Sequence, residues 1–186
     1  MQSVILWLSR ILLKIAGWRV EVSVPDYPKS IICVAPHTSN IDFVICELAY
    51  CSVGRRAGFL MKKSWFRWPL GSIFRAMGGV PVDRSKGNSL TSALVDRFRV
   101  EPRLNIAIAP EGTRSRTSRW HTGFLRVATE AGVPVTLAVI DGGSRTVMMN
   151  EEFIPSGDID ADMAAIKRYY SQFTAIYPEK FSTETE

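Results

Sequence analysis

Cysteine and histidine are scarce in this chain of 186 residues. It has three cysteines, Cys33, Cys46 and Cys51, and only two histidines. No Cys-x-x-Cys pair occurs, so the side chains that hold structural zinc are missing at their usual spacing. An odd number of thiols at these intervals also argues against a disulfide framework. We therefore expect the cysteines to be small core residues in a reducing compartment, and we expect no metal centre.

A long uninterrupted hydrophobic run is also missing. Residues 1–19 are largely apolar, but Arg10 and Lys14 interrupt them. The uninterrupted apolar run is therefore far shorter than the roughly 20 residues that span a bilayer. A signal peptide is disfavoured because the charges fall inside the apolar region. Arg10 and Lys14 share one helical face, while Trp7 and Trp18 lie among the apolar remainder, which is typical of a membrane-interface helix. We predict such an amphipathic helix over 1–19, the alternative being a terminal helix packed on the protein's own core.

The positive charge is modest and is not gathered into a block. The formal net charge is +5 and the pI about 9.3, which is compatible with phosphorylated ligands or an anionic membrane surface. No basic arm typical of nucleic-acid binding occurs, and we expect no nucleic-acid partner. One segment, 59–79, interleaves aromatics with cations. It suits a lipid headgroup boundary, although a single-stranded nucleic-acid surface or a core helix with a solvated edge would look similar.

Apolar runs alternate with helical patterns along the chain, without internal repeats. This alternation predicts one three-layer α/β domain over 20–186, with a mostly parallel or mixed central sheet flanked by helices. The polar tail from Pro178 is expected to fray. The expected strands are 20–24, 31–35, 79–83, 105–109 and 135–140, and the expected helices are roughly 40–53, 64–77, 88–100, 122–132 and 160–175.

The stretch PHTSNID, residues 36–42, joins an expected strand to an expected helix. With Ser39 or Asn40 as the helix N-cap, Asp42 falls in the first turn, where the helix dipole favours an ionised carboxylate. His37 then lies before the helix, so its imidazole can meet that carboxylate and act as a base. An ordinary capping box, with Asp in place of Glu, predicts the same letters.

Two further segments carry polar groups past strand ends. Arg84 ends the segment GGVPVDR and can hold a phosphate with two hydrogen bonds, although taken alone the segment favours a surface ion pair between neighbours. The segment APEGTRSR, 109–116, can form an anion-binding turn. In it, Gly112 lets the backbone approach a ligand. Glu111 is expected to hold an arginine or bind a hydroxyl, while Thr113 supplies a hydroxyl and Arg114 a charge.

These pieces occur in a recognisable order. His37-x4-Asp42, Gly79-Val-Pro-Val-Asp83-Arg84, Glu111-Gly112-Thr113-Arg114-Ser115 and Val133-Pro134-Val135 follow one another at sensible intervals. The chain resembles the glycerolipid acyltransferase family, whose best-known members are the 1-acyl-glycerol-3-phosphate acyltransferases. The resemblance covers roughly residues 30–141.

The resemblance implies acyl transfer from acyl-CoA or acyl-carrier protein to the hydroxyl of a lysophospholipid, at the cytoplasmic face of a membrane. The acyl thioester is then a co-substrate, and no further cofactor is expected. It implies His37 as the base and Asp42 as its partner. It assigns Arg84 and the turn of Glu111, Gly112, Thr113 and Arg114 to the acceptor.

General chemistry leads to the same reaction. A thioester is already activated, so a neutral His37 suffices as general base and no enzyme nucleophile is required. Backbone N–H groups at Ser39 and Asn40 are candidates for holding the oxyanion. Two other readings stay open: transfer to a different lyso-lipid, such as a lyso-aminolipid, and a non-catalytic lipid-binding module.

Overall fold

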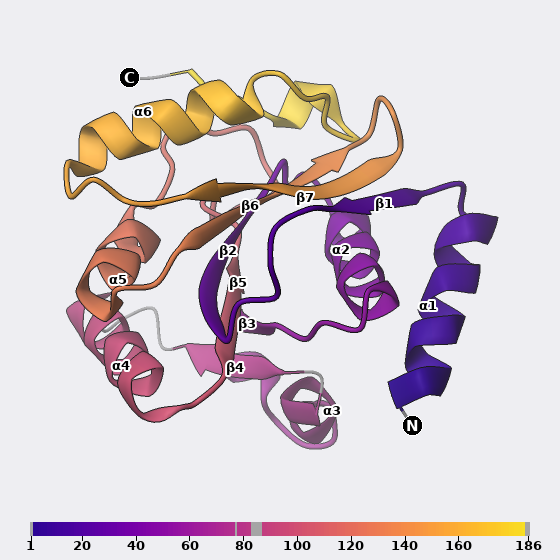
Figure 1. Ribbon diagram of the computed structural model, residues 1–186, viewed down its shortest axis with the longest axis horizontal. Coiled ribbons are helices and arrows are strands. Elements are labelled where there is room, and N and C mark those ends of the chain that lie inside the picture. Colours follow the sequence, from indigo (N-terminus) through magenta and orange to yellow (C-terminus); the bar gives the residue numbers. More distant parts are fainter. Residues whose placement is uncertain (1, 77, 83–86, 185–186) are drawn as a thin grey trace.

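A single sheet with helices on both faces organises the molecule (Figure 1). The computed structural model describes residues 2–76, 78–82 and 87–184. Within these residues the sheet order is β1-β7-β6-β2-β5-β3-β4. The strands are β1 (Arg19–Val22), β2 (Lys29–Ala35), β3 (Gly58–Lys62), β4 (Gly79–Val82), β5 (Leu104–Ile108), β6 (Val135–Asp141) and β7 (Thr146–Phe153). The helices are α1 (Gln2–Ile15), α2 (Asn40–Ser52), α3 (Leu70–Ala76), α4 (Gly87–Val100), α5 (Gly123–Ala131) and α6 (Ile159–Tyr170), with 3-10 turns η1 (Lys63–Trp65) and η2 (Pro178–Lys180).

The sheet is mixed, and its central part is parallel. β2 pairs in parallel with both β5 and β6, and β3 pairs in parallel with β5 and β4. β6 and β7 form the antiparallel pair, and β1 runs parallel to β7. The predicted three-layer α/β architecture with a mixed sheet and an N-terminal helix is therefore confirmed.

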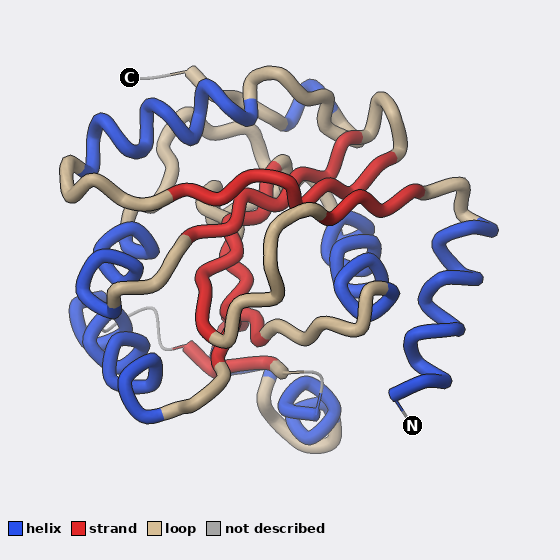
Figure 2. Tube along the Cα trace, in the orientation of Figure 1, coloured by secondary structure: helices blue, strands red, loops and turns tan. Residues whose placement is uncertain are grey.

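Successive side chains of the buried strands point to opposite faces of the sheet, so each face has its own hydrophobic core. In β2, Ile31 and Cys33 pack with α4, α5 and α6, whereas Ile32 and Val34 pack with α1 and α2. Figure 2 shows these helices on opposite sides of the strands. Because both faces are covered, the central strands read as continuous apolar runs rather than as alternating ones.

Three local expectations were wrong. The helix expected over 64–77 is a 3-10 turn followed by α3, because Pro69 lacks an N–H and disfavours helix in the residue before it. Strands β3 and β7 were not predicted, since β3 lies in the aromatic and cationic stretch and the second half of β7 contains the polar residues Asn150, Glu151 and Glu152. The described part of the tail, residues 178–184, does not fray: it forms η2 and then docks on the body of the protein.

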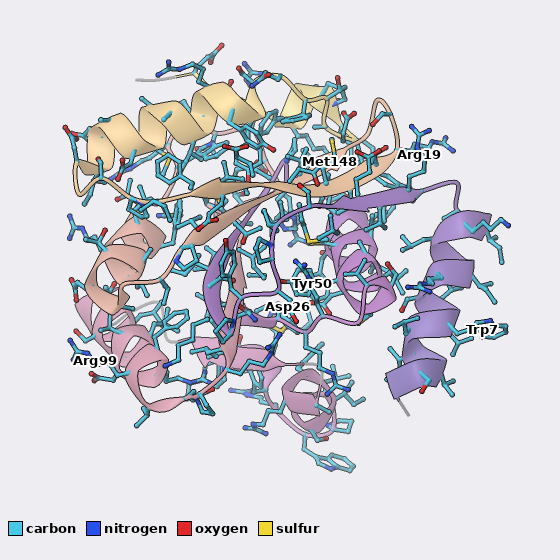
Figure 3. The ribbon with its side chains drawn as sticks, in the orientation of Figure 1. Trp7, Arg19, Asp26, Tyr50, Arg99 and Met148 are labelled. Atoms are coloured by element: carbon cyan, nitrogen blue, oxygen red, sulfur yellow. The ribbon has the colours of Figure 1, made fainter. Side chains whose placement is uncertain are left out.

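Helix α1 packs through one face and exposes another. Leu13 is buried in the core that contains Ile32 and Val34 of β2, and Arg10 Nε donates to the Ser52 carbonyl at 2.8 Å. On the outer side, where Figure 3 shows Trp7, the helix exposes a set of apolar side chains. These are Val4, Ile5, Trp7, Leu8, Leu12 and Ile15. Among the described residues, we find no helix with the length and hydropathy needed to cross a bilayer.

Candidate active site

The carboxyl ends of two neighbouring parallel strands bring the sequence motifs together. Cys33 of β2 lies opposite Ile108 of β5, so the segments 36–42 and 109–116 leave the sheet at the same edge. Ligand sites in parallel α/β sheets form at that edge, outside the carboxyl ends of the strands.

His37 sits before α2 with its ring half-buried and its Nδ1 3.9 Å from Oδ2 of Asp42. The Asp42 side chain is 1% exposed and the His37 side chain 22%. The separation permits a direct electrostatic contact but exceeds a hydrogen bond. Catalytic hydrogen bonds are often long before substrate is bound. The structure therefore brings the two predicted residues together.

Asp42 also closes the capping box of α2. Ser39 is the N-cap, as predicted, and its Oγ accepts from the Asp42 N–H at 3.4 Å. In return, Asp42 Oδ2 accepts from the Ser39 N–H at 2.7 Å, from the Thr38 Oγ at 3.2 Å and from the Thr38 N–H. The carboxylate engages the Ser39 N–H, which argues against this group as an oxyanion donor, while the expected role of the Asn40 N–H stays a prediction.

The electrostatic surroundings of His37 favour its neutral form. Burial lowers the pKa of His37, Asp42 opposes this by raising the pKa, and the charge of Arg114 lowers it further. The imidazole can therefore accept a proton at neutral pH, which a general base must do.

Glu111 holds the backbone of His37 rather than an arginine. Its side chain is buried, 3% exposed, and Oε1 accepts from the His37 N–H at 2.7 Å. Burial raises the pKa of Glu111 to about 8, the hydrogen bond from His37 opposes the rise, and the charge of Asp42 adds to it. The sequence expectation of an arginine or hydroxyl partner is replaced by this backbone contact, which burial at the strand end imposes.

The rest of the 109–116 turn is built on backbone conformation and short side chains. Gly112 adopts a φ of +64°, where a Cβ would lie 2.4 Å from Cδ2 of His121, so the turn requires glycine. Thr113 Oγ1 accepts from the Ser115 N–H at 3.2 Å, which stabilises the turn. Arg114 donates to Asn40 Oδ1 and so ties the turn to the start of α2. The predicted substrate-binding residue Arg84 lies outside the described residues.

A cavity of about 500 Å³ opens beside these groups. Its lining comes from the 38–40 segment, the 114–116 turn and the C-terminal segment: Thr38, Ser39, Asn40, Arg114, Ser115, Arg116, Tyr177 and Lys180. Sequence reasoning gave no role to Thr38, Tyr177 or Lys180. Nothing local in the sequence could have found the last two, because tertiary packing alone returns the chain to this edge.

Comparison with known proteins agrees with this geometry. The acyltransferase family model matches residues 19–140, about two thirds of the chain. The chain belongs to this acyltransferase family, and the resemblance inferred from the motif order is confirmed.

Two individual proteins are similar to this chain, one in sequence and one in structure. A 1-acyl-sn-glycerol-3-phosphate acyltransferase from Limnanthes douglasii is 27% identical over 146 residues, covering 74% of this chain and 48% of the relative. The chain thus spans about half the length of that curated relative. The crystal structure of the 1-acyl-sn-glycerophosphate (LPA) acyltransferase PlsC from Thermotoga maritima superposes with a TM-score of 0.60 at 18% identity. That match covers 92% of this chain and 78% of the other, and it confirms the fold.

Proposed function

We propose that the chain is a membrane-associated O-acyltransferase. It moves a fatty acyl group from acyl-CoA or acyl-carrier protein to the free hydroxyl of a lysophospholipid such as 1-acylglycerol 3-phosphate. The observation that carries the proposal is a half-buried imidazole beside a buried carboxylate, 3.9 Å apart, directly before Thr38 and Ser39, which line a cavity with three cations. The family membership and the names of the two similar proteins support the same reaction.

The chemistry uses His37 as general base. With Nδ1 turned toward Asp42, Nε2 takes the proton of the acceptor hydroxyl while that oxygen attacks the thioester carbonyl. The tetrahedral intermediate then collapses, the C–S bond breaks, and the thiolate receives a proton from the imidazolium. The Asp42 side chain stabilises the imidazolium in between. General base catalysis of this kind contributes about 10²–10⁴-fold.

The charges of the cavity favour a phosphorylated acceptor over other lyso-lipids. Arg114, which touches the start of α2 through Asn40, supplies a planar guanidinium that can hold phosphate with two hydrogen bonds. Fixing the headgroup in this way orients the hydroxyl toward the base. A lyso-aminolipid acceptor would leave this charge unmatched.

Two exposed apolar surfaces support attachment to a membrane. The outer face of α1 exposes Trp7 and Ile15 to 60% and 78%, and the segment before α3 exposes Trp65 and Trp68 to 55% and 91%. Tryptophan with neighbouring cations suits the headgroup boundary of a bilayer. Because acyl-CoA and acyl-carrier protein are soluble donors, we place the protein at the cytoplasmic face, in an interfacial position.

The test follows thiol release from acyl-CoA on vesicles, with lysophosphatidate, other lyso-lipids or no acceptor. We expect release that depends on lysophosphatidate, and a loss of about 10²–10⁴-fold in kcat for His37→Ala with the unfolding transition preserved. Full activity in folded His37→Ala would contradict the assigned base. Binding to vesicles without consumption of thioester by the natural chain would instead favour a non-catalytic lipid-binding module.

A further inference from the structure

The C-terminal segment, residues 177–184, is clamped onto the loop that follows the Glu-Gly-Thr-Arg turn. Trp120 Nε1 donates to the Ser182 carbonyl at 3.1 Å inside the protein. The buried ammonium of Lys167 on α6 donates to the Glu184 carbonyl at 2.7 Å. Each contact satisfies a buried polar group, and such bonds are costly to break. The segment is therefore a fixed part of the site edge rather than a loose end.

The docked segment holds Arg116 of the 114–116 turn in place and brings Lys180 to the cavity. Arg116 Nη1 donates to the Phe181 carbonyl at 3.1 Å, and Nη2 pairs with Glu184 at 3.2 Å. These contacts fix the guanidinium at the cavity wall. On the facing segment, the Lys180 ammonium lies 4.4 Å from the ring centre of Tyr177, and both side chains line the cavity. The ring quadrupole attracts a cation held over its face, which favours one orientation of the ammonium.

The side chains that line the cavity carry an excess of positive charge, of which Arg116 shares part with Glu184 outside the lining. Of the described residues that line the cavity, three are cations, Arg114, Arg116 and Lys180, and none carries a carboxylate. Ser39 and Asn40, at the start of α2, add the positive end of a helix dipole. A phosphate monoester has a charge of about −1.5 to −2 near neutral pH and three acceptor oxygens, so it matches this wall better than a singly charged diester.

We propose that Lys180, together with Arg116, completes a phosphate-binding site whose other half is Arg114. The site selects a substrate with a terminal phosphate monoester. Lys180 lies beyond residues 19–140, which match the family model, so this cation comes from the C-terminal segment, whereas Arg114 and Arg116 lie within the matched range. The identity of the substrate in this inference rests on the proposed function, whereas the binding of a phosphate monoester does not.

Lys180→Gln tests the proposal, because glutamine keeps a long polar stem and removes the charge. With 1-oleoylglycerol 3-phosphate we expect KM to rise about fivefold to tenfold while kcat stays within about twofold, as for one partly solvated charge-assisted bond. With 1-oleoylglycerol, which lacks phosphate, KM should not change. Lys180→Arg should restore the natural KM, since it returns the charge. Arg116 is a poorer target because its removal also releases Phe181 and Glu184.

Arg99→Gln is the matched control. Arg99 is an exposed cation of α4, 67% exposed, and Figure 3 places it at the far side of the molecule from the C-terminal segment. The variant removes the same charge, so an equal rise in KM would overturn the site and point to general attraction of the anionic lipid. Lys180→Gln and Arg99→Gln have the same net charge, so a rise in KM for Lys180→Gln alone supports the site.

Direct binding separates this proposal from the reaction itself. Calorimetric titration of the natural chain with glycerol 3-phosphate, and with glycerol as blank, should give binding that Lys180→Gln weakens by a similar factor. If no thioester is consumed but this dependence holds, the proposed function fails and the phosphate site stands. A rise in KM for acyl-CoA alone would support a phosphate site but assign it to the donor. Unchanged KM for both substrates with unchanged phosphate binding overturns the proposal.

Discussion

Glu111 offers the sharpest test of how the site is held together. Its buried carboxyl accepts from the His37 N–H at 2.7 Å, and burial raises its pKa to about 8. At pH 7 the group is therefore mostly a neutral acid. Glutamine has the same shape and the same acceptor oxygen. We expect Glu111→Gln to keep both the fold and the activity at pH 7, whereas Glu111→Ala leaves a backbone donor unpaired at a cost of about 1–3 kcal/mol.

The pH dependence follows from the direction of the shift. The pKa of Glu111 is raised on folding, so its stabilising contribution is complete below the ordinary pKa of 4.5 and is lost as pH rises through about 8. Each pH unit between these values changes the free energy of unfolding by at most about 1.4 kcal/mol. Between pH 6 and pH 8 the natural chain should lose roughly 2 kcal/mol that Glu111→Gln does not lose.

Urea unfolding of both proteins at pH 6, 7 and 8 measures this difference. Other titrating groups are common to the two chains, so they cancel in the comparison. The natural chain should be the more pH-sensitive one over this range. Two outcomes would refute a neutral buried acid at this position. One is that the free energy of unfolding varies with pH in the same way in both proteins. The other is that Glu111→Gln loses as much unfolding free energy at pH 7 as Glu111→Ala does.

Three further outcomes are expected. Gly112→Ala should cost about 1–3 kcal/mol by calorimetry and lower activity, because φ is +64° and the new Cβ meets the His121 ring; removal of that ring in a double variant should recover only part of the loss. Tyr170→Phe should lower the free energy of urea unfolding by about 1–2 kcal/mol without changing KM, because the hydroxyl donates to the Cys33 carbonyl at 2.6 Å inside the core. The pH–rate profile of kcat/KM should fall only below pH 6.5, since burial lowers the pKa of His37; an apparent pKa above that value in the free enzyme would contradict the base assignment.

The parts of the fold that were predictable are those where one pattern dominates. Residues 31–35 and 135–140 are buried on both sides, so their apolar runs mark strands β2 and β6 clearly. Strand β7 is harder to recognise, because its second half, Asn150–Phe153, is mostly exposed and polar and forms a strand only through pairing with β6. Pro69 was visible in the sequence and should have divided the expected helix over 64–77.

The site shows the same division between local and tertiary information. The position of Asp42 in the first turn of α2 follows from short-range capping rules, which a sequence displays directly. The contact between Glu111 and the His37 backbone joins residues 74 apart and depends on the adjacency of β2 and β5. The approach of Lys180 depends on the whole path of α6 and the tail, which no local pattern encodes.

The capping and catalytic interpretations of Asp42 are compatible, because one carboxylate satisfies both. Oδ2 accepts the N–H groups of Thr38 and Ser39 and still lies 3.9 Å from the imidazole. The bonds that begin α2 therefore also fix the position of the carboxylate that orients His37. A capping box at the end of a buried parallel strand, with histidine just before it, gives a site in which helix initiation and base orientation share the same atoms.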